Sequence, residues 1–309
     1  MALGVFLIWY IFDQFTPEQF TELKRHFKNA NYGYVVLSVV LSVLSHVIRA
    51  YRWNYLLQPL GYAPKLPNTF MAVSVAYLMN IFIPKSGEVS RAVVVAKYEN
   101  IPFDKGFGTV ISERIIDLVL LVLFTALALF LQFDVLYAYL IEVVPVKKLV
   151  LIMGVGILML LSFLAFLKYS KSKLSLKIGT LVRGLQEGVF SILKMKKKTA
   201  FVFWSLVIWG LYLASFYVAT QALEQTATIS IGIIITAFVV GSFTFGFTNS
   251  GFGTYPAAIM GILLVFGISE TVGTALGWIV WVSHIAYIII SGGISFLVLP
   301  FYNRDKLQA

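Results

Sequence analysis

The chain has 309 residues, of which 59% are hydrophobic and 12% are charged, and its mean hydropathy is +0.87. A soluble domain carries about a quarter charged residues, so the composition excludes an ordinary soluble domain and predicts an all-α, polytopic transmembrane protein. The net charge of +10 has no soluble basic face to carry it, so we expect no nucleic-acid partner. The absence of cysteine excludes disulfides and thiolate chemistry, and we expect no metal or other cofactor.

Several apolar stretches are long enough for a helix to cross a bilayer, which takes about 20 residues. Residues 1–12 are apolar but too short, and they lack the basic region and cleavage site of a signal peptide. We therefore expect the first span to begin upstream of Met1 or to be truncated there. The segments that qualify are 34–53, 115–133, 149–167, 200–221 and 272–299.

Two further apolar stretches end in helix-breaking residues. Residues 67–83 run into Ile-Pro-Lys-Ser-Gly-Glu, and residues 229–248 run into Asn-Ser-Gly-Phe-Gly-Thr-Tyr-Pro. Proline and glycine break helices, and a broken helix at membrane depth must be buried in protein or line a wet cavity. The segments that follow the breaks, 101–112 and 256–268, are short, so we predict two re-entrant hairpins.

The positions of the basic residues predict which ends of these elements face the cytoplasm. If 49–114, 168–198 and the C-terminus face the cytoplasm, that face holds 19 of the 24 Lys and Arg residues, as the positive-inside rule requires. The chain is then a multi-pass inner-membrane protein with both termini in the cytoplasm, and its two hairpins enter from opposite sides. Such hairpins are typical of an inverted repeat, whose substrate site lies near the membrane midplane.

The repeat divides one membrane domain into halves of about 1–147 and 148–309. Between the predicted spans of the second half, residues 171–198 are basic and carry apolar residues at helical spacing. This pattern favours an interfacial helix over a solvated run of charge. We expect that helix to lie on anionic phospholipid at the cytoplasmic face.

Polar residues concentrate between positions 49 and 117. Ionisable side chains at membrane depth are costly and by default indicate function, and guanidinium groups suit phosphate because they donate two hydrogen bonds at once. We interpret Arg49 and Lys65 as juxtamembrane charges at the lipid interface. The residues predicted to line a substrate groove are Arg52, Asn80, Glu88, Arg91, Glu113, Arg114 and Asp117.

Helical spacing suggests partners within this set. Glu88 and Arg91 lie three residues apart, as do Arg114 and Asp117, so each pair would share a helix face. Arginine neighbours favour ionised, salt-bridged carboxylates over a catalytic acid. No nucleophile has an activating partner, and we expect no enzymatic activity.

The second break carries no charge. Asn249 and the neighbouring backbone amides offer an anion-binding loop, and a plain close-packing turn is an equally good interpretation. His46 and His284 lie on apolar helices and are interpreted as hydrogen-bonded packing residues rather than a proton relay. Gly292-Gly293 is expected to permit close helix contact.

Three motifs of the first half carry a resemblance to a known family: Arg52-Trp53 with Leu56-Leu57, Asn80-x-x-x-Pro84-x-x-Gly87-Glu88-x-x-Arg91, and Glu113-Arg114-x-x-Asp117. They resemble the lysylphosphatidylglycerol synthase transmembrane region family, also described as flippase-like domain or UPF0104-type membrane proteins. The resemblance implies two re-entrant hairpins and the movement of aminoacylated phospholipid between leaflets, and relatives are linked to lipid-linked sugar pathways. The family pattern Pro-Gly-Gly-x-Gly-x-x-Glu is replaced here at 249–256, so the role of that glutamate does not carry over.

We therefore expect a lipid flippase that moves a phospholipid or lipid-linked head group through a polar groove between the hairpins. Two alternatives remain open. One is an integral membrane transferase acting on polyprenyl-phosphate, with Glu113 and Asp117 as its acidic pair. The other is a non-transporting scaffold for a lipid-modifying enzyme. Homo-oligomerisation is left open by the sequence.

Overall fold

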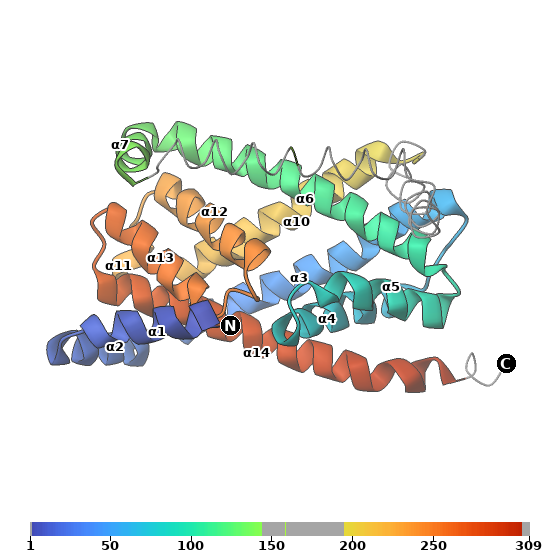
Figure 1. The fold of residues 1–309 in the computed structure, drawn as a ribbon, viewed down its shortest axis with the longest axis horizontal. Helices are drawn as coiled ribbons and strands as arrows, with labels where there is room; N and C mark the ends of the chain where they lie inside the picture. The colour runs from blue at the N-terminus through green and yellow to red at the C-terminus, as the bar shows by residue number, and fades with distance from the viewer. Residues whose placement is uncertain (1, 144–157, 159–194, 305–309) are drawn as a thin grey trace.

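The computed structural model describes residues 2–143, 158 and 195–304, and those residues form helices and loops with no strand (Figure 1). The predicted all-α class is confirmed. The helices are α1 (Ala2–Gln14), α2 (Pro17–Asn29), α3 (Tyr32–Leu57), the short 3₁₀ helix η1 (Gln58–Leu60), α4 (Leu66–Phe82), α5 (Ser86–Glu99), α6 (Phe103–Leu131), α7 (Phe133–Val143), α10 (Lys198–Thr220), α11 (Glu224–Ala227), α12 (Ile231–Phe247), α13 (Thr254–Val265) and α14 (Glu270–Tyr302).

Four of the described helices, α3, α6, α10 and α14, are long and apolar enough to cross a membrane. They confirm four of the five predicted spans. The fifth, 149–167, lies outside the described residues except for residue 158, and most of the predicted interfacial helix 171–198 lies outside them as well. Helix α1 has 13 residues, which is shorter than the roughly 20 residues that a crossing requires.

The two predicted breaks lie between helices too short to cross alone. The first separates the 17 residues of α4 from the 14 residues of α5, and the second separates the 17 residues of α12 from the 12 residues of α13. Each pair packs together as a hairpin.

The return limb of the first hairpin was predicted wrongly. It is α5, whereas residues 101–112 lie in loop Ile101–Pro102 and the start of the continuous helix α6. Asn100 adopts a left-handed conformation with φ 52° at the end of α5, and Pro102 follows it. Helix α6 contains no proline and continues through Gly106 and Gly108, so its polar and apolar parts form one helix.

The two hairpins occupy equivalent positions in the chain. Helix α3 precedes the first hairpin and α6 follows it, just as α10 precedes the second and α14 follows it (Figure 1). Helix α3 packs against α10, α14 against α4, and α6 against α12. This reciprocal packing supports the predicted inverted repeat, and re-entry of the hairpins into a bilayer stays a prediction.

The loops of the two hairpins meet near the middle of the molecule (Figure 1). Asn249 Nδ2 donates to the Ile81 carbonyl oxygen at 3.1 Å, and the Lys85 ammonium group donates to the Gly246 carbonyl. The hairpins therefore approach each other from opposite ends.

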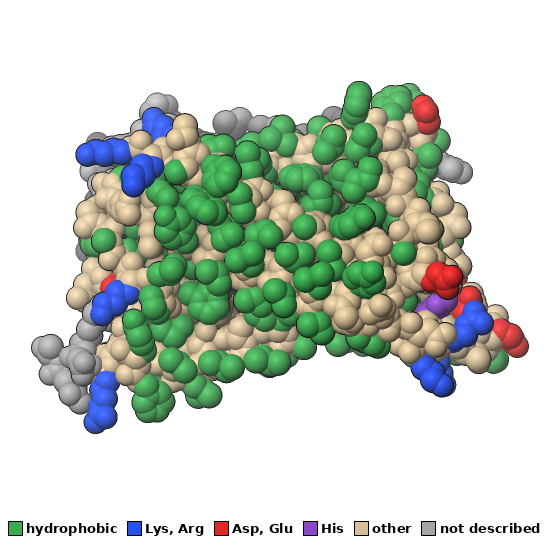
Figure 2. All heavy atoms as spheres, turned by 180° about the vertical axis from the view of Figure 1, so that it is seen from behind, with side chains coloured by type: hydrophobic (Ala, Val, Ile, Leu, Met, Phe, Trp, Pro, Cys, Tyr) green, Lys and Arg blue, Asp and Glu red, His purple; other side chains and the backbone are tan. Residues whose placement is uncertain are grey.

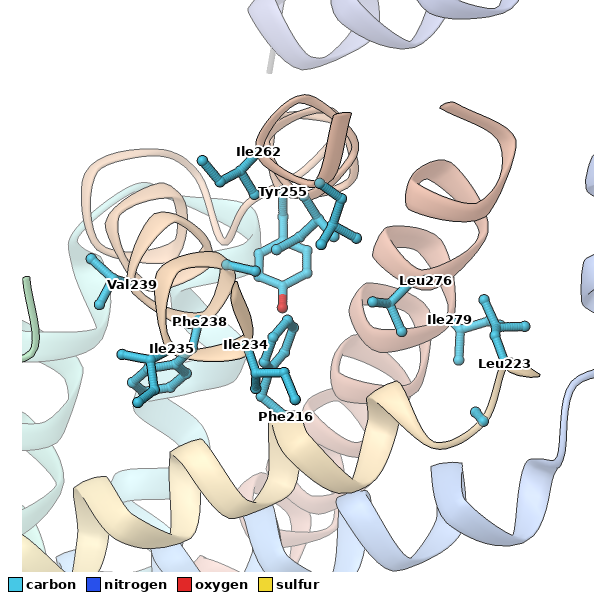
Figure 3. Close-up of a cluster of buried hydrophobic side chains, with 14 of the residues drawn as sticks. Phe216, Leu223, Ile234, Ile235, Phe238, Val239, Tyr255, Ile262, Leu276 and Ile279 are labelled. Atoms are coloured by element: carbon cyan, nitrogen blue, oxygen red, sulfur yellow. The ribbon is translucent and has the colours of Figure 1, made fainter. Parts of the chain in front are cut away.

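Hydrophobic side chains cover the middle of the face shown in Figure 2, and charged side chains gather at its two ends. Large apolar residues of α6 and α14, such as Leu123 and Leu297, are exposed on the outside. Lipid tails account for exposed apolar surface of this extent, which soluble monomers rarely show. Inside, Tyr255 stands among side chains of α10, α12 and α14 in the larger hydrophobic core (Figure 3).

Candidate functional site

Four arginines from three helices converge on one part of the first half. Arg49 and Arg52 lie one turn apart on α3, Arg91 lies on α5 and Arg114 lies on α6. The first three are buried, with at most 2% of each residue exposed. Isolated charges are too costly to bury, so each of these guanidinium groups requires a partner.

Glu113 is the central partner, and it is fully buried. Its Oε2 accepts a hydrogen bond from Arg91 Nη1, and its Oε1 accepts one from Arg52 Nη2 at 3.3 Å. Trp53 lies beneath this group, because the Arg91 guanidinium carbon stands 3.7 Å from the centroid of the indole ring. The Trp53 indole N–H in turn donates to Thr109 Oγ1 at 2.8 Å.

Asp117 lies one turn further along α6, where it pairs with Arg49 and shares Arg52 with Glu113. Arg49 Nη1 donates to its Oδ2 at 2.9 Å, and Arg52 Nη2 donates to its Oδ1 at 3.4 Å. Arg49 Nε also donates to the Tyr212 hydroxyl at 3.1 Å. This last contact ties the first half of the chain to α10.

Arg114 and Glu88 form the exposed edge of the group. Arg114 Nε lies 3.2 Å from Glu88 Oε1, and its Nη1 lies 3.6 Å from Asp117 Oδ2. The Arg114 side chain is 42% exposed. We define the arginine–carboxylate cluster as the set in which four guanidinium groups face three carboxylates, leaving an excess of one positive charge: Arg49, Arg52, Arg91, Arg114, Glu88, Glu113 and Asp117.

A narrow cavity of about 10 Å³ opens onto this cluster, which is room for about one water molecule. Its polar lining comes from α3, α4, α5 and α6, which is the first hairpin and the two spans beside it. The sequence predicted a groove between the two hairpins, whereas the cavity lies within the first half, together with all the charged side chains of the cluster. Its lining residues are Arg49, Val73, Ala76, Tyr77, Asn80, Gly87, Glu88, Arg91, Val110 and Arg114.

Asn80 and Gly87 shape the tip of the first hairpin beside this cavity. Asn80 Oδ1 accepts a hydrogen bond from the Gly87 backbone N–H at 2.8 Å. A Cβ atom at position 87 would lie 2.2 Å from the Ala76 carbonyl oxygen, so only glycine permits this approach of α5 to α4. The Asn-x-x-x-Pro-x-x-Gly spacing therefore positions the backbone that carries Glu88 and Arg91.

Some hydrogen-bond donors of the cluster have no acceptor. Among the described residues, Arg91 Nε, Arg91 Nη2 and Arg52 Nε have no hydrogen-bond acceptor although they are buried. Unsatisfied buried donors are costly, and a bound anion or water would satisfy them. Arg91 lines the cavity, and its unpaired N–H groups are buried behind that lining, so an anion reaches them only if the cavity widens.

The structure brings together most of the residues predicted from the sequence. Arg52, Glu88, Arg91, Glu113, Arg114 and Asp117 belong to one cluster, and Asn80 lines its cavity. Asn249 lies apart from them, at the contact between the two hairpin loops. The predicted pair Arg114–Asp117 is present, whereas Glu88 pairs with Arg114 rather than with Arg91.

Arg49 was wrongly interpreted as a charge at the lipid interface, since it is buried and bonded to Asp117. Its spacing from Arg52 places both residues on one helix face, which was the available signal. Ser205 Oγ accepts a hydrogen bond from Arg52 Nη1 at 2.8 Å. Ser205 was missed as well, as were Tyr77 and Tyr212, because single hydroxyl residues on apolar helices give no such signal. In the described ranges no three His, Asp or Glu side chains are arranged to hold a metal ion.

Residues 1–292 match the family model described as the lysylphosphatidylglycerol synthase TM region. The chain belongs to this family. No solved structure matches the chain.

Two relatives are similar in sequence to parts of this chain. The UPF0104 membrane protein MJ1595 of Methanocaldococcus jannaschii is 35% identical over 100 residues, which are 31% of this chain and 30% of that protein. The glycosyltransferase AglD of Haloferax volcanii is 32% identical over 91 residues, which are 29% of this chain and 15% of that protein. The matches thus cover less than a third of either relative.

Proposed function

We propose that this family member is a lipid flippase that accepts the anionic phosphate of a lipid head group in the cavity of the first half. The observation that carries the proposal is the arginine–carboxylate cluster, whose guanidinium groups exceed its carboxylates by one and whose Arg91 keeps buried N–H groups without acceptors. A phosphate oxygen is a strong acceptor for such groups.

Arg114 is the residue most available to a head group. Its side chain is 42% exposed, whereas Arg49, Arg52 and Arg91 are buried and held by Glu113 and Asp117. The cavity has room for only about one water molecule, so an arriving phosphate meets Arg114 at the mouth, and the cavity must widen as the phosphate displaces Glu88 from Arg114. Glu88 is then free to contact a cationic group on the same lipid, such as the amine of an aminoacylated phospholipid.

The position of the cavity also favours transport. It lies beside the tip of one hairpin, and that tip contacts the other hairpin near the middle of the molecule. In transporters built from inverted repeats, the substrate binds near the midplane beside broken helices. We further propose that the chain lies in the inner membrane with its C-terminus in the cytoplasm, because 19 of the 24 basic residues then face inward.

The transferase alternative finds less support in this geometry. A metal-dependent transferase needs free carboxylate oxygens, but both oxygens of Glu113 and both of Asp117 accept from or pair with guanidinium groups. The name of one relative refers to glycosyl transfer, and that match covers 15% of the relative. It is a reason to include lipid-linked sugars among the substrates tested.

The test is lipid flipping in proteoliposomes with phosphatidylglycerol, aminoacyl-phosphatidylglycerol and a polyprenyl-phosphate sugar. We expect the native protein to move at least one of these lipids, and Arg114→Gln to slow that movement about tenfold or more because it removes the accessible charge. Glu88→Gln is expected to slow the flipping of a lipid that has a cationic group more than the flipping of a lipid that lacks one.

Arg25→Gln is the matched control. Arg25 lies on α2 with its side chain 65% exposed, so the same loss of charge far from the cavity is expected to leave flipping unchanged. If no lipid moves faster than in protein-free vesicles, or if Arg114→Gln flips at the native rate while folded, the proposal is wrong. The transferase and scaffold alternatives would then be tested by divalent-metal-dependent turnover and by co-purification.

A further inference from the structure

Two of the three histidines meet two tyrosines next to the cavity. His46 lies on α3 and is 2% exposed, and its Nδ1 forms a 2.9 Å hydrogen bond with the Tyr287 hydroxyl of α14. The His46 ring stacks on Tyr77 of α4, with centroids 4.3 Å apart. His284 of α14 meets the His46 ring edge-on at 6.3 Å. The group therefore joins both halves of the chain.

This group is continuous with the arginine–carboxylate cluster. Tyr77, which stacks on His46, lines the cavity together with Arg49 and Arg114. His46 precedes Arg49 by three residues on α3 and so shares its helix face. A proton bound at His46 thus adds a positive charge beside a cluster that already has one in excess.

The titratable groups around the histidines are few, and most are neutral. Tyr77 faces His46 from α4 and Tyr287 faces both histidines from α14. On the side of His284, Phe245 of α12 separates it from Tyr255 of α13. The charged groups nearest to His46 are Arg49 on its own helix and, through Arg49, Asp117 of α6; Tyr212 of α10 also bonds to Arg49.

An anion in the cavity changes this balance of charge. A phosphate held by Arg91 and Arg114 offsets the excess positive charge, so a proton on the neighbouring imidazole then costs less free energy. Coupling between two binding sites is reciprocal, so protonation of the histidines must also strengthen binding of the anion. Resting on the proposed function, we infer that His46 and His284 form a proton-binding site that is coupled to occupation of the cavity by an anionic lipid head group.

Protonation fixes the direction of the hydrogen bond to Tyr287, which in the neutral protein depends on the tautomer of His46. In the neutral imidazole one ring nitrogen accepts and the other donates, whereas both donate in the protonated form. The proton comes from water and binds a ring nitrogen, so Nδ1 becomes a donor in every protonated state and the Tyr287 hydroxyl must accept from it. Because α3 and α14 belong to different halves, protonation acts on a contact between the halves.

The test is isothermal titration calorimetry of the purified protein with a short-chain phosphatidylglycerol that carries two hexanoyl chains. Titrations in buffers of different ionisation enthalpy report the protons taken up for each lipid bound. Net proton uptake is expected over the pH interval in which the histidines are protonated in the lipid-bound protein and neutral in the free protein, and titrations from about pH 4 to pH 8 search for it. Over that same interval the dissociation constant should rise by up to about tenfold per pH unit for one coupled proton.

Matched histidine variants identify the site. The double variant His46→Gln, His284→Gln is expected to bind the lipid with no proton uptake and with a weaker pH dependence. His26→Gln, which removes the histidine of α2, is expected to keep the native uptake. Tyr287→Phe keeps the ring and removes the hydroxyl, so if the double variant does not fold, a changed proton uptake in Tyr287→Phe supports the same inference.

The outcomes separate this inference from the function on which it rests. If the native protein binds the lipid without proton uptake, or if the double variant keeps that uptake, the histidines are packing residues and the inference is wrong while the flippase proposal stands. If the native protein binds no anionic lipid, both fall together. Native uptake that the His46 and His284 changes abolish, with binding retained, supports the inference.

Discussion

At the scale of single residues, the cluster shows how a membrane protein keeps many charges at low exposure. Glu113 is shared between Arg91 and Arg52, and Asp117 is shared among Arg49, Arg52 and Arg114. A shared carboxylate compensates two or three guanidinium groups at once. The arrangement still leaves one charge in excess, which favours an anionic ligand over a purely structural network.

Glu113→Gln tests this dependence. The change keeps the shape of the side chain and removes a fully buried charge, so Arg91 and Arg52 lose their common partner. Breaking a buried ion pair in this way costs about 3–5 kcal/mol, and we expect a large drop in the unfolding temperature of the purified protein in detergent. Glu224→Gln makes the same change at an exposed position and should shift stability by less than about 0.5 kcal/mol. Equal unfolding temperatures for Glu113→Gln and the native protein would show that Arg91 and Arg52 do not depend on the charge of Glu113.

At the scale of helices, small residues bring the spans close together. Ser42 and Ser215 join α3 to α10 through hydroxyl oxygens 2.9 Å apart, and Ser215 also donates to the Ser38 carbonyl at 2.8 Å. Hydrogen bonds and close packing replace the hydrophobic effect between helices in a bilayer. The same logic applies to α14, where Gly292 meets α4.

Gly292 and Gly293 give a matched pair of helix positions. A Cβ at Gly292 would lie 2.6 Å from Leu78 Cβ and 2.8 Å from the Ser74 carbonyl oxygen, whereas a Cβ at Gly293 meets nothing within 4 Å. Gly292→Ala should therefore force α14 away from α4 at a cost of about 1–3 kcal/mol. Gly293→Ala should leave stability unchanged or raise it by about 0.5–1 kcal/mol. Thermal unfolding of the two variants decides the point, and equal midpoints would show that α14 adjusts without strain.

The helices also show what the sequence could and could not predict. Long apolar runs identify α3, α6, α10 and α14 because a bilayer demands their length. Helix α5 carries Glu88, Arg91 and Lys97, so its composition resembles a surface loop and its role as a hairpin limb was missed. The partners of Arg49 and Glu88 were missed because they lie on α6, and spacing along one helix says nothing about contacts between helices.

At the scale of the whole molecule, the two halves contact each other at the hairpin loops, along α3 and α10, and through the His46–Tyr287 bond. Alternating access in repeat transporters involves motion of one repeat against the other. Contacts between the halves must then change during transport, whereas contacts within a hairpin need not. The loop contact between Ile81 and Asn249 is suited to a test because it joins the tips of the two hairpins directly.

Cysteine cross-linking distinguishes these two kinds of contact, and the native sequence contains no cysteine to interfere. In Ile81→Cys, Asn249→Cys, a short bis-thiosulfonate reagent should join the hairpin tips and stop lipid flipping, and reduction should restore it. Thr248→Cys, Thr254→Cys is the matched control, because the two hydroxyl oxygens lie 2.9 Å apart within one hairpin. Its cross-linked form is expected to flip lipid at the rate of the unlinked form. Complete cross-linking of the first pair without loss of flipping would mean that the hairpin tips stay together throughout transport.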